Sequence, residues 1–170
     1  WEYVPLGPFL GKSFSTSISP WIVPLAALES ARTAMPARSE PLLEYLDDAD
    51  QEWGLDLTLE LSLNGRTLSR PPFSAMYWSP AQQLAHMTVN GASLRCGDLY
   101  ASGTVSGPDK RQWGSMLELS WRGADPIQPD DGTSRVFLED GDRLVVGGTA
   151  PGPDGTVIGL GEVTGTIRPP

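Results

Sequence analysis

Strict alternation of apolar and polar residues marks residues 55–63. Every odd position there is a leucine, and every even position is Asp, Thr, Glu or Ser. This period of two is that of a β-strand with one face on a core. Asn64-Gly65 follows as a type I′ turn signal, and residues 67–70 are predicted to return as the partner strand. The pattern therefore predicts a β-hairpin.

Two other segments carry helix signals. Pro24 suits a first helical position, and the good helix formers of residues 25–29 follow it. A longer helix is predicted from Ser79, which is followed by a proline in the first helical position and by a glutamine three residues after the cap. This helix is expected to run to about Val89 and to end at the Asn-Gly pair that follows.

The rest of the chain is typical of short strands joined by turns. Further strands are predicted over residues 99–104 and 116–121, with a hairpin over 135–146 around a turn at 139–142, and short strands over 156–160 and 163–167. The 19 Gly and 16 Pro among 170 residues agree with many turns and short elements. Neither a repeat nor a second domain boundary is visible. We therefore expect one mainly β domain with a few short helices.

Charge and apolar content limit the classes of partner. The formal net charge is −9, which argues against nucleic acid and against an anionic membrane surface. The longest apolar run, residues 21–28, is interrupted by Pro24 and is too short to span a bilayer. There is no signal-peptide pattern, and Cys96 is the only cysteine, so a soluble protein of the reducing cytoplasm is expected. The chain opens at Trp1 with no starting loop, which suggests a piece of a longer polypeptide.

Several groups with candidate chemistry have simpler interpretations. His86 is the only histidine, and a lone histidine within a helix is more often structural than a general base. One histidine and one cysteine cannot complete a tetrahedral zinc site. Asp48-Ala49-Asp50 resembles the start of a calcium loop, but Trp53 stands where that loop requires glycine. The segment is therefore interpreted as a solvated acidic loop.

Glu118 is the most informative carboxylate. If residues 116–121 form a strand, alternation places Glu118 on the face opposite two leucines and a tryptophan. Facing solvent, the carboxylate would have no evident role. Facing a cavity, its pKa would rise and it could orient water or a base. The residues alone leave both interpretations open.

A set of segments is similar to the fumarylacetoacetase family, nearly residue for residue. In chain order these segments are residues 3–14, 18–21, 76–78, 82–84, 89–91, 101–108, 114–121, 137–138 and 140–142. They span essentially the whole chain, which makes the resemblance more specific than any single motif. Hydratases and isomerases of the superfamily share the Gly-Lys-Ser-Phe turn of residues 11–14, whereas the block at 114–121 favours the fumarylacetoacetase branch.

The resemblance implies a fold and an activity. The fold is the mixed β-sandwich or roll of the fumarylacetoacetase C-terminal domain, and residues 1–170 correspond to the C-terminal portion of the catalytic domain. The activity is hydrolysis of a carbon–carbon bond in 4-fumarylacetoacetate, a β-diketo acid, to fumarate and acetoacetate in tyrosine and phenylalanine catabolism. The family also implies a cytoplasmic homodimer that uses Mg²⁺ and Ca²⁺, whose main carboxylate ligands lie upstream of this chain.

Five residues match functional positions of the family. Lys12 matches the lysine that stabilises the oxyanion, and its backbone carbonyl matches a contact to the magnesium ion. Thr16 matches another magnesium ligand through its hydroxyl. Tyr3 and Thr104 match substrate-binding positions, and Glu118 matches the glutamate that orients the catalytic histidine and its water.

Some family features are altered or missing. Ser15 stands where the family commonly has glycine, and Cys96 replaces the usual proline. The family's catalytic histidine and metal-binding carboxylates lie upstream of what corresponds to Trp1, and His86 does not match that histidine. This chain is therefore expected to be inactive alone. Two alternatives stay open: a superfamily hydratase or isomerase acting on another β-dicarbonyl, and a non-catalytic module that kept the fold.

Overall fold

The computed structural model describes residues 2–13, 15–48, 53–128 and 132–169, with the backbone alone for Lys12. The strands are β1 (Arg32–Thr33), β2 (Gly54–Leu55), β3 (Thr58–Leu63), β4 (Arg66–Ser69), β5 (Arg143–Pro151) and β6 (Val157–Thr166). The α-helices are α1 (Pro80–Thr88) and α2 (Met116–Leu119). The short 3₁₀ helices are η1 (Leu10–Lys12), η2 (Leu25–Ala31), η3 (Glu44–Leu46), η5 (Phe73–Ala75), η6 (Lys110–Gln112) and η7 (Pro153–Gly155).

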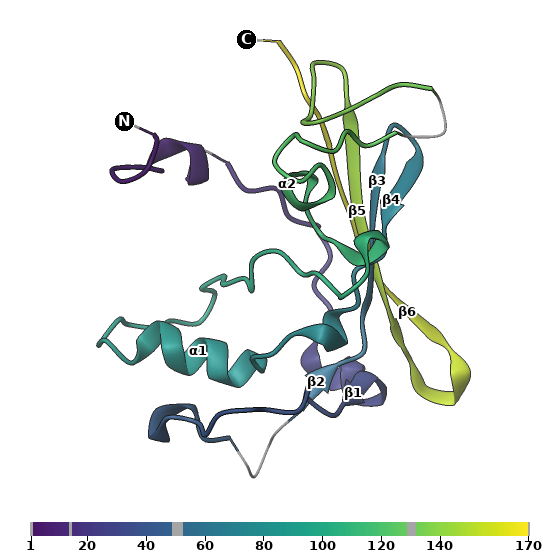
Figure 1. The fold of residues 1–170 in the computed structure, drawn as a ribbon. Coiled ribbons are helices and arrows are strands. Elements are labelled where there is room, and N and C mark those ends of the chain that lie inside the picture. The colour runs from purple at the N-terminus through teal and green to yellow at the C-terminus, as the bar shows by residue number, and fades with distance from the viewer. Residues whose placement is uncertain (1, 14, 49–52, 129–131, 170) are drawn as a thin grey trace.

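These strands form two antiparallel sheets. The larger has the order β4-β3-β5-β6, and β1 pairs with β2 separately. Figure 1 shows the larger sheet as a long twisted ribbon, from which the N-terminal segment and α1 project. The expected mainly β fold with a few short helices is confirmed.

The predicted hairpin of the leucine-rich segment is confirmed as β3 and β4. Asn64 and Gly65 have φ values of 51° and 81°, the left-handed pair that a type I′ turn requires. The first strand is shorter than the alternation predicts and begins at Thr58. Upstream of it, Gly54–Leu55 pairs with Arg32–Thr33 instead, so the alternating run is shared between two sheets.

The long hairpin of β5 and β6 differs from the prediction. Residues 135–142 are not its first strand, because they form a turn and a single bridge between Arg135 and Ile127. The two short strands predicted over 156–160 and 163–167 are one strand, β6. Gly161, at a φ of 80°, permits the irregular pairing there without ending the strand.

Residues 99–104 do not form the predicted strand. They carry no ladder pairing to any other part of the chain that the structure describes, and all six are exposed. Strand propensity alone does not make a strand without a neighbouring edge to pair with. The predicted strand over residues 116–121, in the candidate site, is not formed either.

The principal core lies where the 3₁₀ helix η2 meets the two sheets. Its buried members are Leu28, Ala31, Leu55, Leu57 and Ala150. The helix predicted after Pro24 is present, in 3₁₀ form, and contributes the first two of these residues. The alternating leucines thus supply the core face that their period predicts.

The predicted helix after Ser79 is confirmed as α1, with its capping box. Ser79 Oγ accepts from Gln82 N at 3.1 Å, and Gln82 Oε1 accepts from Ser79 N at 3.0 Å. Gln82 Nε2 also donates to Leu46 O at 3.0 Å, which fixes η3 against the helix. None of the helices in the described ranges is long and apolar enough to cross a membrane.

The fold leaves much apolar surface open to solvent. The accessible area is 12,066 Å², whereas a compact monomer of this size exposes roughly 8,100 Å². The excess includes the N-terminal segment, where Tyr3 is 87% exposed, Val4 82% and Ile22 92%. Apolar exposure of this extent is typical of a surface that another polypeptide covers.

A buried carboxylate ties the turn between β3 and β4 to the turn at residues 139–142 that precedes β5. Asp142 is 2% exposed and accepts hydrogen bonds from Asn64 Nδ2 at 2.8 Å, Glu139 N at 2.9 Å and Arg135 Nε at 3.0 Å. Burial raises the pKa of Asp142, but the hydrogen bonds from Arg135, Glu139 and Asn64 outweigh it, so the pKa lies below its ordinary value of 3.8. The folded state therefore favours the ionised form.

Replacing Asp142 with asparagine is expected to lower the free energy of unfolding by about 2 kcal/mol at pH 7, because Arg135 then lacks its buried partner. Because the folded pKa lies below the unfolded value of 3.8, the stabilisation reaches its full value about one pH unit above 3.8 and is lost as pH falls through the folded pKa. Urea unfolding of both proteins should give a constant difference above about pH 5 and a shrinking one below about pH 4. Glu162→Gln, on the exposed face of β6, is the control, and a difference independent of pH for Asp142→Asn would contradict the assignment.

Candidate functional site

The segment around Glu118 is helical, so the predicted strand over residues 116–121 is wrong. Met116–Leu119 forms the single turn of α2, and Ser115 caps it by accepting from Glu118 N at 3.2 Å. The spacing of Ser115 and Glu118 is that of a capping box, a signal that the apolar alternation had obscured. The cap satisfies the first backbone donors of the helix locally, without a neighbouring strand.

The Glu118 carboxylate is half-buried and held by two serine hydroxyls. Ser106 Oγ lies 2.9 Å from Oε1 and 2.8 Å from Oε2, and Ser115 Oγ donates to Oε2 at 3.0 Å. Each hydroxyl has a single proton, whereas the carboxylate offers about four acceptor positions. At least two positions therefore remain for a water molecule or a ring N–H. The strand interpretation could not have found these two serines.

Gly114 brings the segment of residues 104–106 against the start of α2. A Cβ at Gly114 would lie 2.0 Å from Val105 O and 3.1 Å from Thr104 Cγ2, so no larger residue fits. Gly114 N also donates to Ser106 Oγ at 3.1 Å. The structure thus places Thr104 and Glu118, two of the predicted site residues, on segments in direct contact.

The N-terminal residues form a second, separate part of the candidate site. The Glu2 carboxylate accepts from Phe9 N and Leu10 N, both at 2.8 Å, and from Gly11 N at 3.3 Å. The bonds from Phe9 and Leu10 chiefly, with a smaller one from Gly11, hold the pKa of Glu2 below its ordinary value despite a small opposing effect of burial. These bonds close a loop and hold the backbone at the start of η1. Nothing in the local sequence pattern predicts this role of Glu2.

The predicted residues of this N-terminal part are largely exposed. Tyr3 O accepts from Leu6 N and Gly7 N, while the Tyr3 ring extends into solvent. Thr16 is exposed in an irregular segment, and the Lys12 side chain lies outside the described part of the structure. Within the described ranges, no hydrogen bond joins residues 2–16 to the Glu118 cluster. The two parts are each ordered locally and are not brought together.

His86 contacts Tyr45, which belongs neither to the Glu118 cluster nor to the N-terminal loop. Its Nδ1 lies 3.0 Å from Tyr45 Oη, and the two rings stack with centroids 6.1 Å apart. This contact supports the structural role that was expected for the histidine in the sequence.

Comparison with known proteins decides the family. A family profile, Fumarylacetoacetate (FAA) hydrolase C-terminal, matches residues 1–168. The chain belongs to this family. Fumarylacetoacetases from Homo sapiens and Arabidopsis thaliana are each 47% identical to it, and that from Caenorhabditis elegans is 45% identical, in each case over 99% of this chain. The chain spans 41% of the length of these relatives.

The residues that the structure describes do not complete the metal set expected for the fumarylacetoacetate hydrolase family. Mg²⁺ and Ca²⁺ take six or more oxygen ligands, largely from carboxylates. Across the residues that the structure describes, no three His, Cys, Asp or Glu side chains cluster to hold an ion. The predicted donors, the Lys12 carbonyl and the Thr16 hydroxyl, would supply two ligands. Both residues stay predicted ligands, and they do not by themselves form a site.

Removal of the Ser106 hydroxyl tests the cluster that positions Glu118. Ser106→Ala is expected to lower the free energy of unfolding by about 1–2 kcal/mol, because a charged acceptor and the Gly114 N–H lose a partner. Urea unfolding measures the change. Ser102→Ala is the matched control, since the Ser102 hydroxyl donates only to its neighbour Gly103 O, and it should change stability by less than about 0.5 kcal/mol. Equal losses in the two variants would contradict the arrangement.

Proposed function

We propose that this chain is the C-terminal portion of a fumarylacetoacetase that hydrolyses 4-fumarylacetoacetate to fumarate and acetoacetate. The observation that carries the proposal is the match to fumarylacetoacetases at up to 47% identity along 99% of the chain. The chain spans 41% of those relatives, so the activity is proposed for the polypeptide as its gene encodes it. The 170 residues alone are expected to be inactive.

The reaction requires an activated water and a stabilised oxyanion. Water attacks a carbonyl carbon of the diketone, and the resulting oxyanion collapses as the carbon–carbon bond breaks. The electron pair leaves on the acetoacetate carbon, which then takes up a proton. The base that deprotonates the water is expected to be a histidine outside this chain. Binding groups that are strongest toward the oxyanion lower the barrier most.

In this proposal Glu118 is a positioning residue. A histidine that acts as a base must keep one ring nitrogen free toward water, and an acceptor at the other nitrogen fixes that tautomer. The half-buried Glu118 carboxylate, oriented by Ser106 and Ser115, retains acceptor capacity for such an N–H or for the water itself. The ordered hydroxyl contacts support this role, because an oriented acceptor loses little freedom in the reaction.

The N-terminal loop would supply the remaining groups. We assign the Lys12 ammonium to the oxyanion, and the Tyr3 and Thr104 hydroxyls to the carboxylate or carbonyl groups of the β-diketo acid. The Glu2 bonds that hold the backbone of η1 support a defined position for the Lys12 backbone. We further propose that Mg²⁺ and Ca²⁺ bind the complete enzyme, with carboxylates from outside this chain, and no step above depends on them.

We also propose a cytoplasmic homodimer. The accessible area of 12,066 Å² exceeds that of a compact monomer by about 3,900 Å². Interfaces of permanent complexes bury areas of this order, which supports coverage by the rest of the polypeptide and by a second copy. The exposed thiol of Cys96 suits a reducing compartment.

Product analysis of the gene-encoded polypeptide tests the function. With fumarylacetoacetate and Mg²⁺ or Ca²⁺, the expected outcome is equimolar fumarate and acetoacetate, quantified by NMR, with no turnover by the 170-residue chain alone. Hydrated or isomerised product without cleavage would favour the superfamily alternative. Absence of any turnover by the complete polypeptide would favour a non-catalytic module, and turnover by the 170 residues alone would contradict the need for groups outside them.

A further inference from the structure

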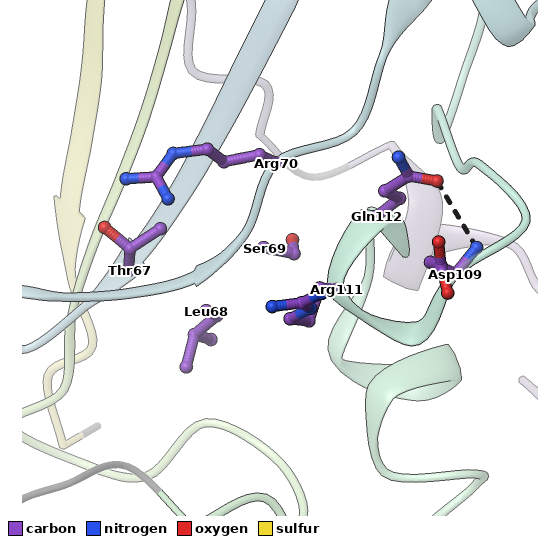
Figure 2. Close-up of a pocket in the computed structure, with 7 residues that line it drawn as sticks. All are labelled: Thr67, Leu68, Ser69, Arg70, Asp109, Arg111 and Gln112. Atoms are coloured by element: carbon purple, nitrogen blue, oxygen red, sulfur yellow. Dashed lines mark hydrogen bonds between the residues drawn. The ribbon is translucent and has the colours of Figure 1, made fainter.

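A pocket separate from the Glu118 cluster lies between β4 and η6. It has a volume of about 310 Å³ and is lined on one wall by residues 67–70 and on the other by Asp109, Arg111 and Gln112. Figure 2 shows residues 67–70 on one side of the pocket and Asp109, Arg111 and Gln112 on the other, with the Arg70 side chain extending away from η6 toward Thr67. None of the residues proposed for hydrolysis lines it.

Backbone contacts hold the two walls in place. Arg70 N donates to Arg111 O at 2.7 Å, which ties the end of β4 directly to η6. Gln112 Oε1 accepts from Asp109 N at 3.3 Å, the bond drawn in Figure 2, and closes the turn of η6. A pocket with walls joined in this way needs little rearrangement to accept a ligand.

Two of the residues that line the pocket, Arg70 and Arg111, are cationic in a chain whose formal net charge is −9. Arg70 Nε pairs with Glu60 Oε2 at 2.8 Å, which leaves its other guanidinium nitrogens without this partner. Within the described residues, the Arg111 guanidinium makes no hydrogen bond or ion pair. An unpaired guanidinium presents a planar fork of donors that matches a carboxylate or a phosphate.

Ser69 adds an unsatisfied hydroxyl at the same place. Ser69 is 3% exposed, and its Oγ is shielded from solvent with no hydrogen-bond partner among the residues that the structure places. Such a group costs about 1–3 kcal/mol, so native structures rarely leave one unpaired. Ser69 itself lines the pocket, so a ligand there that reaches the hydroxyl would supply the missing partner.

We propose that this pocket binds a small oxyanion, a carboxylate or a phosphate, through the guanidinium groups of Arg111 and Arg70 and the hydroxyl of Ser69. Asp109 lines the opposite wall, and its negative charge disfavours a second anionic group at that end. The ligand class is therefore a molecule with one anionic head. The site goes beyond the proposed hydrolase function and does not depend on it.

Thermal unfolding of the gene-encoded polypeptide at constant ionic strength tests the site, with inorganic phosphate, propionate and neutral propionamide as probes. A saturable rise in Tm is expected with phosphate or propionate and none with propionamide. The anion that saturates at lower concentration identifies the head group. Arg111→Gln should raise the half-saturating concentration about tenfold or more. Arg66 is an exposed arginine of β4 outside the pocket, so Arg66→Gln should leave that concentration unchanged.

The Tm of Ser69→Ala, with and without the anion, is a second test of the site. It can be measured even if Arg111→Gln does not fold. Removing the unpaired hydroxyl should raise Tm without ligand and weaken the response to the anion several-fold. The proposal is overturned by no saturable response to either anion, by an equal response to propionamide, by an equal loss in Arg66→Gln, or by a Ser69→Ala protein that responds like the wild type.

Discussion

The contact of the Glu118 carboxylate with the hydroxyls of Ser106 and Ser115 is the interaction on which the candidate site depends. It joins an irregular segment to the helical turn α2, at the place where Gly114 lets the two backbones touch. A carboxylate oriented from two segments keeps its direction without a partner from elsewhere. The Glu118 carboxylate is therefore an oriented acceptor with capacity for a further hydrogen bond.

Other hydrogen-bond networks fix the sheet and the N-terminal loop separately, and much apolar surface stays exposed. The Asp142 network ties the β3–β4 turn to the turn before β5, and hydrogen bonds to the Glu2 carboxylate fix the backbone of η1. The described residues bring Thr104 beside Glu118 but leave the N-terminal loop as a separate part. The apolar N-terminal segment is exposed to an extent that a compact monomer does not show. This division agrees with the match to fumarylacetoacetases of which this chain spans 41%.

Local signals in the sequence predicted the elements that local interactions form. The hairpin turn at Asn64 and the capping box at Ser79 were both found correctly, because each involves residues only a few positions apart. Residues 99–104 and 116–121 were assigned as strands wrongly, since a strand needs a partner that the pattern does not reveal. At Ser115 a second local signal was present and pointed to the helix.

The candidate site was predictable only in part. Family resemblance indicated Glu118 and Thr104, which lie on touching segments, but not Ser106 or Ser115, which orient the carboxylate. Glu2 was likewise missed, because its bonds to Phe9 and Leu10 span seven and eight residues in an irregular loop. Contacts of this kind follow from tertiary packing, which neither periodicity nor composition encodes.

The most direct measurement is a double-mutant cycle on kcat for fumarylacetoacetate cleavage by the gene-encoded polypeptide, with Ser106→Ala and Glu118→Gln. If Ser106 acts by orienting the Glu118 carboxylate, Ser106→Ala lowers kcat in the wild-type background and has little further effect once Glu118 is glutamine. An equal loss from Ser106→Ala in both backgrounds would mean that the serine acts independently of Glu118, which would contradict the account.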